Sequence, residues 1–190
     1  MEQSNGNLIY SLVEELFPIN RSITGPGLRK TLKIIKREIP DLNIFEVPSG
    51  EKVFDWTIPD EWSVNDAYII DPSGNKILQF KENNLHLVGY SIPFKGVLSL
   101  EELQLHLHSL PKQPEAIPYV TSYYQKNWGF CISHSERENL KDGIYKVHID
   151  SELKQGNLNY GEIILKGDSD NEIFFSTYIC HPSMANNELS

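Results

Sequence analysis

The feature that most restricts the fold is a nearly continuous apolar run near the end of the chain, E-I-F-F-S-T-Y-I-C at Glu172–Cys180. A strand that is apolar at successive positions must be covered on both faces, as a central strand of an α/β sheet is. The run is far shorter than the roughly 18 apolar residues of a membrane-spanning helix. We therefore expect an α/β domain in which Glu172–Cys180 is a buried central strand.

The first fifty residues have the succession of helices and strands that is typical of the same fold class. Apolar side chains at residues 7–17 recur at helical spacing and predict a first helix. Gly25-Pro26-Gly27 supplies a turn and a proline suited to the start of a second helix, which Pro40 ends. Asn43–Val47 then reads as a strand.

The texture changes to short β-like runs between residues 50 and 155. Asp71-Pro-Ser-Gly74 predicts a hairpin turn between strands at 67–70 and 76–80. Ser99-Leu-Glu-Glu102 is a capping box, and it predicts a helix that continues to Pro111. Further strands are expected at 119–124, 129–133, 143–149 and 161–166. We predict an α/β domain formed by residues 1–49 and 156–190 and interrupted by a β-rich inserted domain at 50–155.

Composition restricts the location and the partners. The chain has 26 acidic and 17 basic residues and a net charge of −9, without a basic stripe, so nucleic acid is not expected as a partner. No signal sequence or membrane span is visible, and we expect a soluble, cytoplasmic protein that does not bind membranes. Cys131 and Cys180 stand alone within apolar runs, as buried thiols of a reducing compartment would, although their spacing also permits a disulfide.

A histidine directly after the apolar run is the main candidate for chemistry. In open α/β sheets, ligands bind at the carboxyl ends of the strands, where His181 is expected. This position alone allows a metal ligand, a general base or a structural histidine. Asn186, Asn187 and Glu188 then supply three consecutive oxygen-bearing side chains, which suits a loop returning to the same metal. Zinc needs three or four protein ligands, so the others would lie beyond Ser190.

Sequence blocks along nearly the whole chain resemble the co-catalytic zinc aminopeptidase family. More narrowly, they resemble an uncharacterised branch labelled aminopeptidase-like or polysaccharide biosynthesis protein. The blocks are F-P-I-N-R-S-I-T-G-P-G-L-R (Phe17–Arg29), F-D-W-T-I-P-D-E-W (Phe54–Trp62), N-L-H-L-V-G-Y-S (Asn84–Ser91), Y-V-T-S-Y-Y (Tyr119–Tyr124), W-G-F-C (Trp128–Cys131) and I-C-H-P-S-M-A-N-N-E-L-S (Ile179–Ser190).

The resemblance implies the N-terminal part of a zinc-aminopeptidase-like α/β domain. His181 matches the family's first zinc ligand, and Asn186 or Asn187 matches the aspartate that bridges two zinc ions in the wider family. A neutral amide offers one oxygen and no charge there, which leaves one or two zinc ions open, and Glu188 is an acidic substitute. The family's general-base glutamate would follow Ser190, so no catalytic residue is expected in this chain, and the chain alone is expected to be inactive.

Two functions follow from the resemblance. The first is a zinc-dependent aminopeptidase-like hydrolase acting on a peptide or amino-acyl substrate, including a glycan-linked one. The second is a non-peptidase binding protein in surface-polysaccharide biosynthesis. The inserted domain would serve as a lid or as a recognition module, depending on whether its aromatic rings are buried or exposed; these rings are Trp56, Trp62, Tyr90, Tyr123, Tyr124 and Trp128.

Two further groups of side chains have both a structural and a functional interpretation. Arg21, Ser22, Thr24 and Arg29 surround the Gly25-Pro26-Gly27 turn, where they could bind an anion or serve as turn and cap residues. The remaining candidates are histidines of the middle region, which we expect to be structural or exposed: His86, His106, His108 and His134.

Overall fold

The computed structural model of the protein describes residues 5–182. The chain divides into two compact units, which we call unit 1 (Met1–Glu61 with Gln155–Ser190) and unit 2 (Trp62–Lys154). The expected inserted domain at 50–155 begins earlier than unit 2. The interpretation of the two units as an aminopeptidase-like domain and an insertion stays a prediction.

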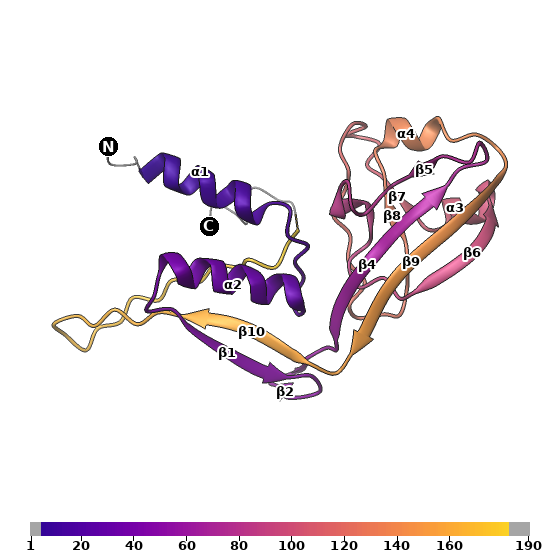
Figure 1. The fold of residues 1–190 in the computed structure, drawn as a ribbon. Coiled ribbons are helices and arrows are strands. Elements are labelled where there is room, and N and C mark those ends of the chain that lie inside the picture. Colours follow the sequence, from indigo (N-terminus) through magenta and orange to yellow (C-terminus); the bar gives the residue numbers. More distant parts are fainter. Residues whose placement is uncertain (1–4, 183–190) are drawn as a thin grey trace. The chain divides into compact units, whose positions relative to one another are not determined.

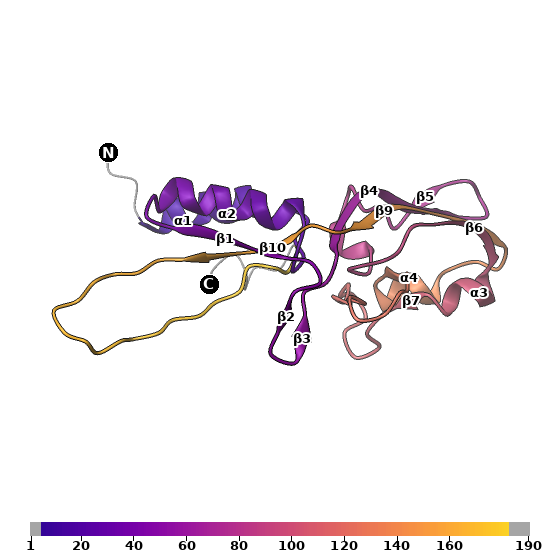
Figure 2. The same ribbon diagram turned by 90° about the horizontal axis from the view of Figure 1, so that it is seen from below.

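Two helices form one layer of unit 1, as the helical spacing predicts (Figures 1 and 2). They are α1 (Asn5–Leu16) and α2 (Pro26–Glu38). Proline at the first turn of α2 costs no hydrogen bond, because the N–H groups there have no partner within the helix. The apolar stripe of α2 faces inward, where Leu28 and Leu32 pack with Leu42.

Two long-separated segments form the sheet of unit 1. β1 (Asn43–Pro48) pairs antiparallel with β10 (Asn157–Glu162) along their full lengths, from Asn43 opposite Glu162 to Pro48 opposite Asn157. A small hairpin of β2 (Lys52–Val53) and β3 (Trp56–Thr57) follows β1. The strand predicted at 161–166 therefore lies four residues earlier, because pairing with β1 determines where it begins and ends.

The predicted central strand at Glu172–Cys180 is absent from the structure. Residues 163–180 have no strand partner, and Figure 2 shows the chain after β10 as a long loop that leaves β10 and returns. Phe174 and Phe175 are each 88% exposed. The physical reason is that a strand needs neighbours for its backbone hydrogen bonds and cover for its two faces. Only the mixed α/β character of the expected fold is therefore confirmed.

A four-stranded sheet organises unit 2, with the strand order β5–β4–β9–β6 (Figure 1). The turn at Asp71 is confirmed, because its Oδ1 accepts hydrogen bonds from the backbone N–H groups of Ser73 and Asn75. The sheet strands are β4 (Glu61–Ile70), β5 (Lys76–Ile77), β6 (Phe94–Ser99) and β9 (Ile144–Lys154). The other elements are η1 (Asn84–His86), α3 (Leu100–Gln104), β7 (Leu107–His108), β8 (Phe130–Cys131) and α4 (His134–Glu138).

Two predictions for unit 2 need correction. The capping box at Ser99 is present, but the helix ends at Gln104 and does not reach Pro111. Leu107–His108 instead pairs in parallel with β8, so a tertiary contact overrides the helical pattern. The strand predicted at 119–124 is reduced to one bridge between Thr121 and Gly89.

Most aromatic rings of unit 2 are structural. Trp62 and Tyr90 are stacked and almost completely buried, and Trp128 is buried between Phe94 and His106. Tyr124 is the exposed exception, at 75%. Buried rings favour a structural role over recognition by these side chains.

Across residues 5–182, no helix is both long and apolar enough to span a membrane.

Candidate metal centre

His181 is tied to unit 1 through its own backbone. Its carbonyl oxygen accepts a hydrogen bond of 3.0 Å from Nε of Arg21, a residue 160 positions earlier. Arg21 also donates from Nη1 to the carbonyl oxygen of Leu16, at 2.7 Å. The guanidinium thus links the end of α1 to the candidate ligand. Close by in the sequence, Ile179 packs against the apolar cluster around Leu28.

The local sequence explains why an arginine is buried here. α1 ends at Leu16, and the last carbonyls of a helix need donors from outside the helix. Arg21 supplies one such donor from the segment before α2, and its residue exposure is only 1%. Burial lowers the pKa of Arg21 to about 10, so the group remains a cation at neutral pH.

The surroundings of the His181 ring favour the protonation state that a metal ligand needs. Burial, and then the positive charge of Arg21, lower the pKa of His181 below its ordinary value. The ring therefore favours the neutral imidazole, which is the form that coordinates zinc. The ring of Tyr178 meets it edge-on, with centroids 5.1 Å apart at 70°. His181 fits the role of one nitrogen ligand.

The remaining predicted ligands are not described by the structure. Asn186 and Asn187, and the alternative Glu188, lie outside residues 5–182, and their assignment stays a prediction. Within the described range, no three His, Cys, Asp or Glu side chains gather as a metal site. Burial raises the pKa of the neighbouring Cys180 thiol.

The two cysteines are free thiols. Cys131 belongs to unit 2 and Cys180 to unit 1. Burial raises the pKa of Cys131 to about 12. The sequence left a disulfide between Cys131 and Cys180 open, and the structure shows both as free thiols.

The residues around Gly25-Pro26-Gly27 bond within the protein. Ser22 Oγ donates to the carbonyl oxygen of Thr24, and Thr24 Oγ1 donates to that of Asp60 at 3.3 Å. Arg29 forms a two-pronged ion pair with the carboxylate of Glu61. These contacts, together with those of Arg21, favour the structural alternative over anion binding. Sequence reasoning missed Glu61 as the partner, although it lies within the F-D-W-T-I-P-D-E-W block.

Two glycines explain the spacing of this turn. Gly25 has φ of 104°, a conformation that favours glycine. Gly27 lies against the backbone, since a Cβ there would be 1.8 Å from the carbonyl oxygen of Asn20. The segment that positions Arg21 is therefore closely fitted to the start of α2.

The four histidines that the sequence singled out in unit 2, His86, His106, His108 and His134, have structural surroundings or partial burial. His86 Nδ1 lies 2.9 Å from the carbonyl oxygen of Cys131, and His134 Nδ1 lies 3.0 Å from Ser109 Oγ. His106 stacks on the Trp128 ring at 3.7 Å. His108 is half-buried, and burial followed by the nearby Arg137 and His106 lowers its pKa.

This chain is similar to one protein family model, one named protein and one solved structure. Residues 61–152, nearly the extent of unit 2, match a family described as "Domain of unknown function (DUF2172)". Over 97% of its length the chain is 52% identical to a Clostridium acetobutylicum protein named "Putative polysaccharide biosynthesis protein with aminopeptidase-like domain", of which it covers 42%. A crystal structure titled as a "putative peptidase" from Clostridium acetobutylicum is also 52% identical, with a TM-score of 0.90, over 95% of this chain and 43% of that one.

The chain thus spans about two fifths of the length of these relatives. Its similarity to them covers nearly all of its own length, in agreement with sequence blocks that extend from Phe17 to Ser190. The resemblance indicated by those blocks is therefore confirmed: over nearly all of its length the chain is similar to a protein named for polysaccharide biosynthesis and an aminopeptidase-like domain.

Proposed function

We propose that this chain is part of a zinc-dependent hydrolase of the aminopeptidase type, in which His181 is a metal ligand. The observation that carries the proposal is the hydrogen bond from buried Arg21 to the His181 carbonyl. This contact fixes the backbone of the ligand, while the lowered pKa of the ring keeps its nitrogen lone pair available. The usual second contact of a metal-binding histidine is made to its ring N–H, whereas this contact restrains the backbone that carries the ring.

The zinc ion would act as a Lewis acid toward the carbonyl of a peptide or amino-acyl substrate, including one linked to a glycan. His181 would contribute one nitrogen, and Asn186 or Asn187 one neutral oxygen. Because a neutral oxygen holds a second dication weakly, a single tightly bound zinc ion is the favoured stoichiometry. Arg21 keeps its positive charge behind the ligand backbone and does not contact the substrate.

The test measures zinc content and turnover of aminoacyl p-nitroanilides by the full-length protein. His181→Ala should lose zinc and activity together. Arg21→Met should weaken zinc binding although it removes no ligand, and Arg21→Lys should restore part of the affinity. His134→Ala, which removes a histidine from unit 2, is the matched control. A His181→Ala protein that retains stoichiometric zinc and full turnover would refute the proposal.

A second candidate is a binding protein that acts in surface-polysaccharide biosynthesis without peptidase activity. The observation in its favour is the pair of neutral amides, Asn186 and Asn187, at the position of the bridging aspartate. Polysaccharide binding that persists after chelation, in a protein that hydrolyses no aminoacyl substrate, would select this function over the first.

A further inference from the structure

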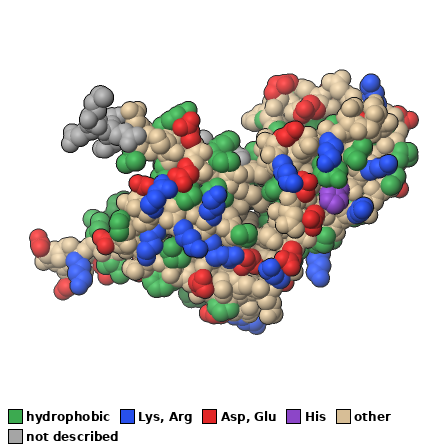
Figure 3. Space-filling view, in the orientation of Figure 1, with side chains coloured by type: hydrophobic (Ala, Val, Ile, Leu, Met, Phe, Trp, Pro, Cys, Tyr) green, Lys and Arg blue, Asp and Glu red, His purple; other side chains and the backbone are tan. Residues whose placement is uncertain are grey.

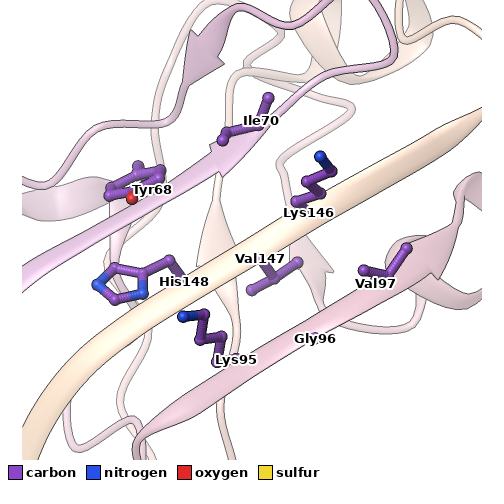
Figure 4. A pocket seen from close by; sticks show the side chains of 8 residues that line it. All are labelled: Tyr68, Ile70, Lys95, Gly96, Val97, Lys146, Val147 and His148. Atoms are coloured by element: carbon purple, nitrogen blue, oxygen red, sulfur yellow. The ribbon is translucent and has the colours of Figure 1, made fainter.

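The outer face of the unit 2 sheet carries a groove that the proposed hydrolase does not use. Side chains alternate along each strand, so Ala67 and Ile69 point into the core while their neighbours point outward. The groove has a volume of about 520 Å³ (Figure 4). Its lining residues are Tyr68 and Ile70 from β4, Lys95, Gly96 and Val97 from β6, and Lys146, Val147 and His148 from β9.

Strand register places the basic side chains of the groove on one face of the sheet. Lys95 lies opposite His148, and Val97 lies opposite Lys146. Figure 4 shows the Lys95 and His148 side chains close to each other beside Tyr68. Among the residues that the structure describes, neither Lys95 nor Lys146 forms an ion pair. None of the residues that line the groove carries a carboxylate.

Lys76 adds a further cation at the rim. Its Nζ lies 3.7 Å from the centroid of the Tyr68 ring, within the range of a cation–π contact. The space-filling view shows both Lys or Arg and Asp or Glu side chains around a histidine on the face over β4, β9 and β6 (Figure 3). The basic lining of the groove contrasts with the net charge of −9 of the whole chain.

The aromatic groups of the groove are suited to hydrogen bonding. The ring of Tyr68 packs against His148 with centroids 4.9 Å apart, and it also contacts Lys76. Its hydroxyl and the His148 nitrogens can exchange hydrogen bonds with a ligand. Ile70 and Val97 provide apolar contact area beside these polar groups.

We propose that this groove binds an anionic saccharide, a sugar bearing carboxylate or phosphate groups. Its volume lies within the roughly 300–1,000 Å³ of small-molecule sites. Lysine ammonium groups would bind the anionic substituents, while the phenol and imidazole would bind sugar hydroxyls. A nucleic acid strand is disfavoured, because it needs free aromatic faces and a long basic track, and the net charge of the chain repels a long polyanion.

The test measures the affinity of this 190-residue chain for trigalacturonic acid and for glucose 1-phosphate by isothermal titration calorimetry, with neutral maltotriose as the reference ligand. Lys95→Gln combined with Lys146→Gln should weaken binding about tenfold or more, since each lost contact is a charge-assisted hydrogen bond. Tyr68→Phe should cause a smaller loss, because it removes only the hydroxyl. The charge-matched control combines Lys112→Gln with Lys126→Gln, two exposed positions of unit 2 outside the groove.

Binding that is lost in the groove variant and kept in the control supports the site, for either anionic ligand. Equal affinities of the two double variants, equal binding of maltotriose, or no binding at all would overturn it. Tighter binding of an oligoadenylate or of hexaglutamate than of both sugars would overturn the assignment to a saccharide. Chelation should leave the affinity unchanged, so the outcome is separate from the fate of the metal proposal.

Discussion

Substituting the two partners of the Arg29–Glu61 ion pair should lower the folding stability by unequal amounts. The arginine side chain is 32% exposed, whereas that of the carboxylate is only 10% exposed. Hydrogen bonding to Glu61 raises the pKa of Arg29, in agreement with a charged pair. Glu61 also accepts a hydrogen bond from the backbone N–H of Asn157 at 3.4 Å. We expect Arg29→Met to cost more stability than Glu61→Gln.

The magnitudes follow from what each substitution leaves behind. Arg29→Met strands a nearly buried carboxylate, and breaking a fully buried pair in this way costs about 3–5 kcal/mol. Because Arg29 is partly screened by water, we expect about 2–3 kcal/mol here. Glu61→Gln leaves an amide oxygen that can still accept one N–H, and a guanidinium that can turn to water, so about 1 kcal/mol is expected.

Urea unfolding followed by circular dichroism at 222 nm measures these losses of stability in unit 1, which contains both residues. The signal reports mainly on unit 1, because α1 and α2 have 12 and 13 residues, whereas the α-helices of unit 2 have five each. Arg37→Met is the control, since its ion pair with Glu15 is exposed on both sides, and such surface pairs contribute little to stability. An Arg29→Met cost equal to that of Glu61→Gln, or to that of Arg37→Met, would refute the reasoning.

Three other substitutions and treatments test separate features. Gly27→Ala should destabilise unit 1 by about 2 kcal/mol or more in the same urea assay, because its Cβ would collide with the Asn20 carbonyl; an unchanged midpoint would contradict this contact. Phe174→Ser should change the unfolding free energy of this chain by less than about 0.5 kcal/mol and should reduce binding of the dye ANS, because the side chain is 88% exposed. A cost of several kcal/mol would instead indicate a buried strand. Raised thiol pKa values keep Cys131 and Cys180 protonated at pH 8, so iodoacetamide should alkylate both more slowly than it alkylates free cysteine, and mass spectrometry should find Cys180 modified first because it is less buried. Preferential modification of Cys131 would contradict the structure.

Local signals in the sequence predict the elements that local interactions determine. The helices α1 and α2 follow from apolar periodicity and from Pro26, and the hairpin after Ile70 follows from the turn residues. The capping box at Ser99 is also a local device, and it appears as expected. The end of that helix was not predictable, because the residues after it form β7, which pairs with β8, a strand more than twenty residues later in the sequence.

The apolar run at Glu172–Cys180 shows the limit of hydrophobicity as a signal. Its composition indicates a segment suited to burial, but the burial itself depends on neighbouring strands. Among residues 5–182, β1 and β10 pair only with each other in their sheet. At the candidate metal centre, the position of His181 after this run was visible in the sequence. The role of Arg21 was not, because its contact with His181 joins residues 160 positions apart.

The pairing of β1 with β10 has a consequence for the order of folding during synthesis. Ser49, directly after β1, bonds to Gly156, directly before β10, although the two lie 107 positions apart. At about 5–20 residues per second, a ribosome needs roughly 5–20 s to make the intervening chain. Unit 2 is continuous in sequence, and it can acquire its own sheet while β1 waits without a partner. Because β4 and β9 are neighbours in that sheet, its formation brings the two ends of unit 2 together and reduces the entropy that β1 and β10 must lose to meet.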